Sequence, residues 1–277
     1  NSDNDASTWT ATYTVADSHT DGAVAFTLDF ADLAGNSGTQ VTAVTDNSSV
    51  TVDQTAITLS ALTIASNNAN TALATTGDVI TLTINATEDY TTAPTVVFTG
   101  ATNDDVVAVV VGDASQYTAT YTVAANDTNG VLAFTVTSTD AAGNVSTNTA
   151  LITDNTGVTI DTDVPALSSV SIASSNNTNT LAMAGDTVTL IFTASEAIGT
   201  PTVTFESGDA NIANNVTVSD IGDDDATTWK ATYAVAANDT DGAVTYSISF
   251  SDLTGNAGVA VTSGSGSVTV DTTIPQA

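Results

Sequence analysis

Residues 9–15 read WTATYTV, and near-copies of this stretch read YTATYTV at 117–123 and WKATYAV at 229–235. In each copy, large or apolar residues alternate with small or polar ones. Because successive side chains of a β-strand point to opposite faces of its sheet, this alternation predicts a strand with one buried face. In the second copy, the buried face is expected to hold Tyr117, Ala119 and Tyr121.

Three further stretches repeat in the same order, which indicates an internal repeat. They are DLAGN, DAAGN and DLTGN at 32–36, 140–144 and 252–256; VTVD, VTID and VTVD at 50–53, 158–161 and 268–271; and LSALTIAS and LSSVSIAS at 59–66 and 167–174. The VTVD-type copies lie 108 and 110 residues apart. The chain therefore divides into the second half of a repeat at 1–53, complete repeats at 54–161 and 162–271, and the start of another repeat at 272–277.

Each complete repeat contains seven short alternating runs separated by Gly, Asn and Asp, a pattern typical of strands joined by turns. In the first complete repeat the runs lie near 57–66, 78–88, 94–100, 106–112, 116–125, 130–140 and 147–160. The sixth run is expected to bury Leu132, Phe134 and Val136. Seven strands in this length predict an all-β fold of tandem immunoglobulin-like β-sandwich repeats of about 108–110 residues.

The half repeat at 1–53 supplies only the last three of these strands. Without the opposing strands, Trp9 and Phe26 would be exposed. Two sources of the opposing strands stay open at this point: sequence upstream in the parent chain, or another chain that donates strands.

The charge of the chain excludes several classes of function. There are 31 acidic residues against a single Lys or Arg, so the formal net charge is −30. Nucleic-acid binding is excluded because phosphate contacts need Lys and Arg, and binding to an anionic membrane surface is excluded for the same reason. No apolar run approaches the ~20 residues of a membrane-spanning helix, so membrane insertion is not expected.

The residue types also argue against an enzyme. There is no Cys, and the only His is His19, which lies in the half repeat. Its equivalents 108 and 220 residues later are Asp127 and Asp239, so a loop role is predicted rather than a Ser-His-Asp triad. The carboxylates recur with the repeat, which indicates an architectural role because a catalytic pair is needed only once.

Carboxylates are expected to gather at the junctions between repeats. In a sandwich, the loops after the second and sixth strands lie beside the incoming linker. This would bring together Asp53, Glu88, Asp140 and Asn144 at one junction, and Asp161, Asp163, Glu196, Asp252 and Asn256 at the next. Two carboxylates about 4 Å apart repel by about 4 kcal/mol at an effective dielectric near 20. Calcium, a hard cation with six to eight oxygen ligands, would remove that repulsion.

An alternative interpretation of the DLAGN-type loops is purely structural. Asp, Gly and Asn are good turn formers, and Gly143 and its equivalents can supply a positive φ angle.

The strand pattern, the VTVDTTIP junction at 268–275, the TASEAI segment at 193–198 and the DLAGN-type loops resemble bacterial Ig-like repeats. Such repeats form stalks of large surface adhesins and other surface-layer or biofilm proteins. The resemblance implies a secreted or cell-surface spacer whose partners are neighbouring repeats, with junctions stiffened by calcium. One alternative is a subunit of an extracellular filament or surface layer, in contact with other copies and exchanging strands with them. A second alternative is a glycan-binding Ig-like module, for which Tyr90 is the best exposed aromatic candidate.

Overall fold

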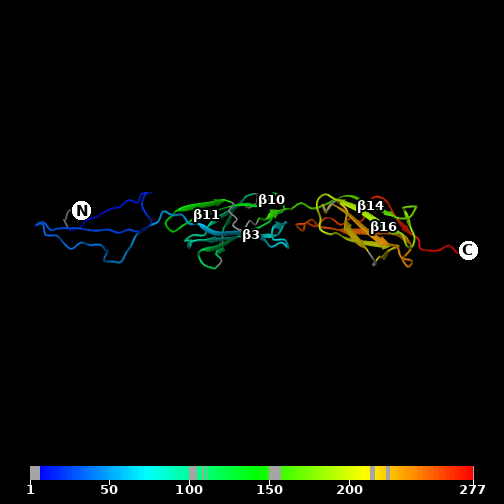
Figure 1. The fold of residues 1–277 in the computed structure, drawn as a ribbon, viewed down its shortest axis with the longest axis horizontal. Helices are drawn as coiled ribbons and strands as arrows, with labels where there is room; N and C mark the ends of the chain where they lie inside the picture. The colour runs from blue at the N-terminus through cyan, green and yellow to red at the C-terminus, as the bar shows by residue number, and fades with distance from the viewer. Residues whose placement is uncertain are drawn as a thin grey trace.

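The computed structural model describes residues 7–99, 105–107, 109–110, 112–149, 157–212, 216–222 and 225–276. Every element in this part of the chain is a β-strand. No helix among these residues is long and apolar enough to cross a membrane. The half repeat and the two complete repeats follow one another along a single long axis (Figure 1).

The first complete repeat is built from two four-stranded sheets. One sheet has the order β3-β5-β9-β8, with β3 at Leu59–Ser66, β5 at Val79–Ala86, β9 at Gln116–Thr122 and β8 at Val109–Val110. The other has the order β12-β11-β6-β7, with β12 at Val145–Thr149, β11 at Ala133–Thr139, β6 at Thr95–Thr99 and β7 at Asp105–Val107. A short third ladder, β10-β13-β4, joins Gly130–Val131, Thr159–Ile160 and Leu73–Ala74.

The second complete repeat has the same plan. Its first sheet has the order β14-β16-β20-β19, at Leu167–Ser174, Thr187–Ala194, Thr228–Ala234 and Thr217–Asp220. Its second sheet has the order β15-β22-β21-β17-β18, at Leu181–Ala182, Thr269–Val270, Gly242–Ser249, Thr202–Ser207 and Ala210–Asn211.

This strand order identifies the fold. In chain order, the first sheet of each repeat holds the A, B, E and D strands of an immunoglobulin-like sandwich, and the second holds C, F and G. The short strands β4 and β15 pair in parallel with the last strand of their repeats, while all the long pairings are antiparallel. The predicted all-β fold of immunoglobulin-like β-sandwiches is therefore confirmed.

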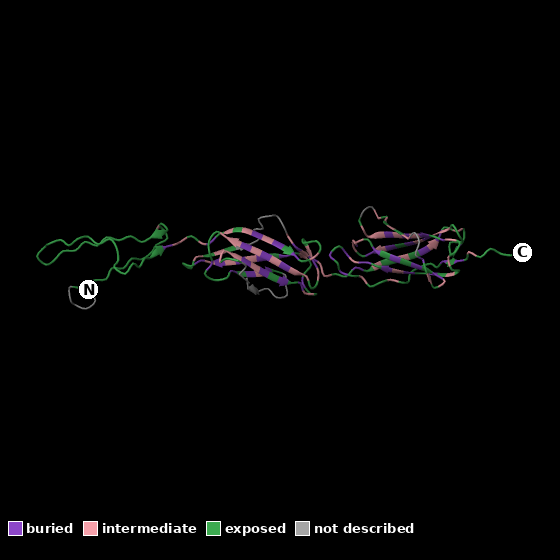
Figure 2. Ribbon diagram, turned by 90° about the horizontal axis from the view of Figure 1, so that it is seen from below, coloured by how far each residue is buried: buried purple, intermediate pink, exposed green. Residues whose placement is uncertain are grey.

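Each complete repeat encloses its own core. One buried cluster extends from Ile57 to Ile160, and the other extends from Ile172 to Val270. The predicted inward faces are confirmed, because Tyr117, Ala119 and Tyr121 on β9 are all buried. Leu132, Phe134 and Val136 are buried as well. Figure 2 shows the buried colour recurring along the strands of both complete repeats.

Two predicted strands differ in detail from the structure. The run near 106–112 lies partly outside the described residues, and its described parts divide between the two sheets, with β7 beside β6 and β8 beside β9. The run at 147–160 also lies partly outside them, and its ends form two strands: β12 pairs with β11, and β13 pairs with β10 and β4. The short strands β4 and β15 were not predicted, because two residues are too few to show a periodicity.

The prediction that Tyr90 is an exposed aromatic is wrong. Only 5% of Tyr90 is exposed, and its ring packs edge-on against that of Tyr117 with centroids 5.0 Å apart. Its hydroxyl lies 3.0 Å from the Ser138 Oγ atom, which is itself buried. In the second complete repeat, the equivalent pair is Ile198 and Phe250, and both are buried. Tyr90 therefore fills the core, which removes the residue on which a glycan site was predicted.

In the described part of the half repeat, β1 (Gly22–Ala23) pairs with β2 (Thr51–Val52), and two isolated bridges join Leu28 to Val41 and Ala31 to Ser37. As predicted, Trp9 and Phe26 are exposed. Figure 2 shows this segment almost entirely in the exposed colour.

Candidate functional site

The DLTGN loop at 252–256 is organised by the side chain of Asp252, which is 6% exposed. Its Oδ1 atom accepts hydrogen bonds from the backbone N–H groups of Thr254, Gly255 and Asn256 and from the Thr254 hydroxyl, at 2.7–2.9 Å. Its Oδ2 atom accepts a bond of 2.8 Å from the Asn256 amide. The turn-forming role considered from the sequence is therefore present in the structure.

The same loop forms in the other two copies. Asp140 accepts bonds from the backbone N–H and the side-chain amide of Asn144, each at 2.8 Å. Asp32 accepts the equivalent bonds from Asn36 at 2.8 and 2.7 Å. Because a charged acceptor strengthens a hydrogen bond, the loop keeps one shape in all three copies.

The asparagine of this loop also holds the incoming linker. The Asn256 amide donates to the backbone carbonyl of Asp161 at 2.9 Å, and the Asn144 amide donates to the carbonyl of Asp53 at 3.1 Å. From their sequence positions, both asparagines were expected to offer side-chain oxygens to a metal. In the structure their amide nitrogens act as donors, and the Asn256 Oδ1 atom accepts a bond from the Thr75 hydroxyl.

Side chains of the preceding repeat also hold the linker. Asn129 accepts bonds from the Thr162 backbone N–H at 2.9 Å and donates to the Asp161 carboxylate at 3.0 Å. Its equivalents Asp21 and Asp241 accept bonds from the backbone N–H groups of Gln54 and Thr272, at 2.8 and 2.6 Å. This position lies in the turn before β1, β10 and β21. We call the paired contacts of the Asn129 and Asn256 side chains with residues 161–162 the linker clamp.

Direct contacts between the complete repeats add to the linker clamp. Asn68, in the loop after β3, donates to the backbone carbonyl of Thr254 at 2.9 Å. Thr75, in the loop after β4, bonds to Asn256. The DLTGN loop of one repeat therefore rests on two loops of the repeat before it.

Three of the predicted metal ligands lie together at this junction. Carboxylate oxygens of Asp161, Glu196 and Asp252 all lie within 4.8 Å of one another. Two oxygens bound to the same calcium ion can be about 5 Å apart at most, so this spacing is compatible with one shared ion. All the donors are oxygens, the type that calcium prefers.

The electrostatics of this group show mutual repulsion. Burial, together with the charges of Asp161, Asp252 and Asp163, raises the pKa of Glu196 above its usual value. Burial also works to raise the pKa of Asp252, but the hydrogen bonds from Asn256 and Thr254 outweigh it and hold that pKa below its usual value. The Asp252 carboxylate therefore stays charged. The repulsion among the carboxylates appears instead in the raised pKa of Glu196.

The other predicted ligands are less closely gathered. Asp163 is near enough to act on Glu196, and its backbone N–H donates to the Asp161 carboxylate at 3.1 Å. At the junction before it, Asp53, Glu88 and Asp140 do not form a group of this kind, although Asn144 still reaches the Asp53 carbonyl. Of the carboxylates in the described ranges, only those of Asp161, Glu196 and Asp252 are spaced to share an ion.

Sequence reasoning did not find the residues of the preceding repeat that complete the junction: Asn129 as a linker contact, and Asn68 and Thr75 as loop contacts. Position 21/129/241 was detectable, because it carries Asp, Asn and Asp in the three copies. Asn68 was detectable as well, because its equivalent is Asn176, whereas Thr75 carried no such signal, since its equivalent is Met183.

His19 has a local role in the structure. Its Nδ1 atom accepts a bond of 2.9 Å from the Ala16 backbone N–H, which closes a tight turn. Asp127 and Asp239 close the same turn by accepting bonds from the backbone N–H groups of Ala124 and Ala236, both at 2.8 Å.

Comparison with known proteins gives structural likenesses of low similarity. No protein-family model matches the chain, and no curated protein sequence matches it. Among solved structures, a chimeric titin Z1Z2 carrying a decorin peptide is 15% identical, with 79% of this chain and 97% of that chain covered at a TM-score of 0.30. A marsupial T cell receptor is 13% identical, with 76% and 72% covered at a TM-score of 0.41.

Proposed function

We propose that this chain is a spacer segment of a long secreted or cell-surface repeat protein, of the kind that forms the stalk of a bacterial adhesin or biofilm protein. Its work is mechanical, because it sets the distance between whatever lies at the two ends of the array. The observation that carries this proposal is the linker clamp, which fixes residues 161–162 to the repeats on both sides.

The clamp favours a rod over a flexible tether. An unconstrained linker between domains normally permits relative motion. Here a two-residue segment has its backbone N–H bonded to Asn129 and its carbonyl bonded to Asn256, and loop contacts from Asn68 and Thr75 lie beside it. Several short polar contacts act on the same few residues, so bending the junction would break them together.

Calcium is the second part of the proposal. The chain has a single Lys or Arg, so it offers almost no cation of its own to neutralise Asp161, Glu196 and Asp252. A bound calcium ion would supply that charge and would tie the linker, through Asp161, to two loops of the repeat that follows. Sites in extracellular modules typically bind calcium at about 0.1–1 mM.

The calcium test compares two glutamates. Isothermal titration calorimetry of the chain should show calcium binding, with Kd of about 0.1–1 mM. Glu196→Gln should weaken binding at least tenfold, while Glu206→Gln, an exposed change on β17, should leave it unaltered. Small-angle X-ray scattering should give an extended particle whose maximum dimension is better defined with calcium than with a chelator. Absence of calcium binding in the unsubstituted chain would exclude the calcium part, and a broad range of dimensions under both conditions would exclude the rod.

A filament or surface layer, considered from the sequence, is a second candidate. Electron microscopy of the native assembly separates the two: isolated thin stalks support the spacer, and a periodic lattice or fibre supports the filament.

A further inference from the structure

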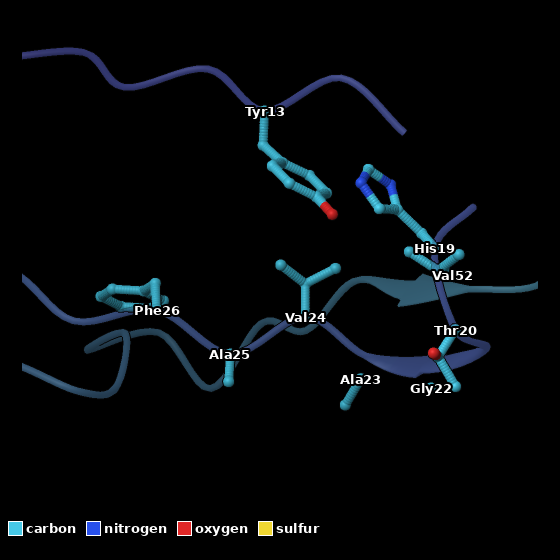
Figure 3. A pocket seen from close by; sticks show the side chains of 9 residues that line it. All are labelled: Tyr13, His19, Thr20, Gly22, Ala23, Val24, Ala25, Phe26 and Val52. Atoms are coloured by element: carbon cyan, nitrogen blue, oxygen red, sulfur yellow. The ribbon is translucent and has the colours of Figure 1, made fainter. Parts of the chain in front are cut away.

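Position 21/129/241 faces the linker in all three copies. In each copy, the glycine after it pairs with the last strand residue before the linker: Gly22 with Val52, Gly130 with Ile160, and Gly242 with Val270. Figure 3 labels Gly22 and Val52, which form the first of these pairs. Because the paired strands are antiparallel, the residue before each glycine lies opposite the first residue of the linker. The ladder therefore holds Asp21, Asn129 and Asp241 against their linkers.

In the first and third copies, an aspartate at this position meets a threonine of the linker. The Asp241 Oδ1 atom accepts bonds of 2.6 and 2.8 Å from the backbone N–H and the hydroxyl of Thr272. Its Oδ2 atom accepts a bond of 2.6 Å from the Thr273 hydroxyl. Asp21 accepts the equivalent bond from the Thr55 hydroxyl at 2.5 Å. Hydrogen bonds from Thr273 and Thr272 hold the pKa of Asp241 below its usual value, so this acceptor stays charged.

The middle copy exchanges both residue types. Asn129 stands in place of the aspartate, and Asp163 stands in place of the threonine. The Asn129 Oδ1 atom still accepts bonds from the backbone N–H and the hydroxyl of Thr162, at 2.9 and 3.0 Å. Its Nδ2 atom donates to Asp161 Oδ1, the same atom that accepts the Asp163 backbone N–H. Each copy thus places one carboxylate on the two positions, but the middle copy places it on the linker side.

Exchanging one position without the other would lose this match. An aspartate at position 129 has no N–H group to donate to Asp161, and its charge would face the carboxylates of Asp161 and Asp163. An aspartate at position 273 would likewise face Asp241 and would remove the hydroxyl donor. With a single Lys or Arg in the whole chain, almost no side chain is available to offset such a pair of like charges.

We infer that positions 21/129/241 and 55/163/273 form a matched pair that selects which linker a repeat accepts. A repeat with aspartate at the first position accepts a linker with threonine at the second, and a repeat with asparagine accepts a linker with aspartate. The partner of this surface is the linker of the repeat that follows, so the pair restricts the order of repeats along the array. This inference rests on the spacer role proposed above, because only joined repeats need matched junctions.

The test is a double-substitution cycle at the middle junction of the 277-residue chain, with a chelator present. Hydrogen–deuterium exchange of the Thr162 backbone amide, followed by NMR, reports on its bond to Asn129. Asn129→Asp should speed this exchange about tenfold or more, because the linker loses a donor and gains a like charge. Adding Asp163→Thr should bring the rate back to within about threefold, since the junction then has the residue types of Asp241, Thr272 and Thr273.

A second cycle and a charge control accompany this test. Thr273→Asp sets a carboxylate against Asp241 and should speed exchange of the Thr272 amide, and adding Asp241→Asn should reverse the change. Asn177→Asp is the charge control, because it adds the same charge to an exposed loop of the second complete repeat. It should leave exchange of the Thr162 amide unaltered.

Three results would overturn the inference. Unchanged Thr162 exchange in Asn129→Asp would show that the neutral amide is not required. Failure of Asp163→Thr to restore the rate would show that the two positions act independently. An equal effect of Asn177→Asp would assign the change to net charge. None of these results depends on calcium binding or on the dimensions of the particle, so they are distinct from a failure of the spacer proposal.

Discussion

The contribution of Asn256 to the junction yields a quantitative prediction. Asn256 is 9% exposed, and its amide donates to the Asp252 carboxylate and to the Asp161 carbonyl. Asn256→Ala removes both bonds, together with the bond that the Asn256 Oδ1 atom accepts from Thr75, and leaves a buried carboxylate oxygen without its side-chain donor. A hydrogen bond to a charged group contributes about 1.5–3 kcal/mol, and one to a neutral carbonyl contributes about 0.5–1.5 kcal/mol. The expected loss for the second complete repeat is therefore about 2–4 kcal/mol.

Trp229 makes the measurement specific. It is 6% exposed in the core of the second complete repeat, whereas Trp9, the only other tryptophan, is 74% exposed before any unfolding. A change in tryptophan fluorescence during urea unfolding therefore reports on that repeat. With a urea dependence of about 2 kcal/mol per molar for a domain of this size, the midpoint should fall by about 1–2 M.

The control is the same substitution one repeat earlier. Asn144→Ala removes the equivalent bonds to Asp140 and Asp53, but it belongs to a separate core, so the Trp229 transition should stay in place. A shift below about 0.3 M for Asn256→Ala, or equal shifts for the two variants, would refute the view that this asparagine holds the junction.

Three further predictions concern pH and the core. The pKa of Glu196 is raised from its usual value near 4.5, so the folded protein binds this proton more tightly than the unfolded protein does. With a chelator present, the free energy of unfolding should therefore rise as the pH falls from 7 toward the raised pKa of Glu196. Glu196→Gln should remove this rise, and the lowered pKa of Asp252 should produce the opposite trend only below its usual value of 3.8. Tyr90→Phe should cost the first complete repeat about 1 kcal/mol in urea unfolding, because the buried Ser138 hydroxyl loses its partner, and no loss would contradict that bond. Gly258→Ala should cost about 1–3 kcal/mol because its Cβ would overlap the Phe250 ring, while Gly199→Ala, whose nearest neighbour lies at 3.8 Å, should be tolerated in the same assay.

Much of the fold was predictable from local sequence. The alternation of Tyr117, Ala119 and Tyr121 determines which face of β9 is buried, because successive side chains of a strand point to opposite faces in any sheet. The repetition of this pattern beside a DLAGN-type loop gave the number of repeats without reference to contacts. The loop geometry was likewise local, because Asp252 bonds to residues within four positions of itself.

Periodicity could not decide the environment of single side chains. Tyr90 follows a strand in a polar loop, so its position indicates exposure, yet it packs on Tyr117 and bonds to Ser138 from a distant strand. Position 138 is the small residue Ser, and the equivalent position in the next repeat is Phe250. The small side chain of Ser138 leaves space in the core, and the Tyr90 ring occupies it. Only the three-dimensional packing of both positions shows this exchange.

For this protein, the sequence by itself determined the strand pattern, the repeat and the acidic positions, because these follow from nearest neighbours and from one conserved spacing within the chain. The tertiary structure decided which acidic residues meet. Asp161, Glu196 and Asp252 come together while Asp53, Glu88 and Asp140 do not, although both sets occupy equivalent sequence positions. At the Asp161 junction, Asn68 and Thr75 of the preceding repeat also contact the DLTGN loop, and such contacts depend on how two folded surfaces fit.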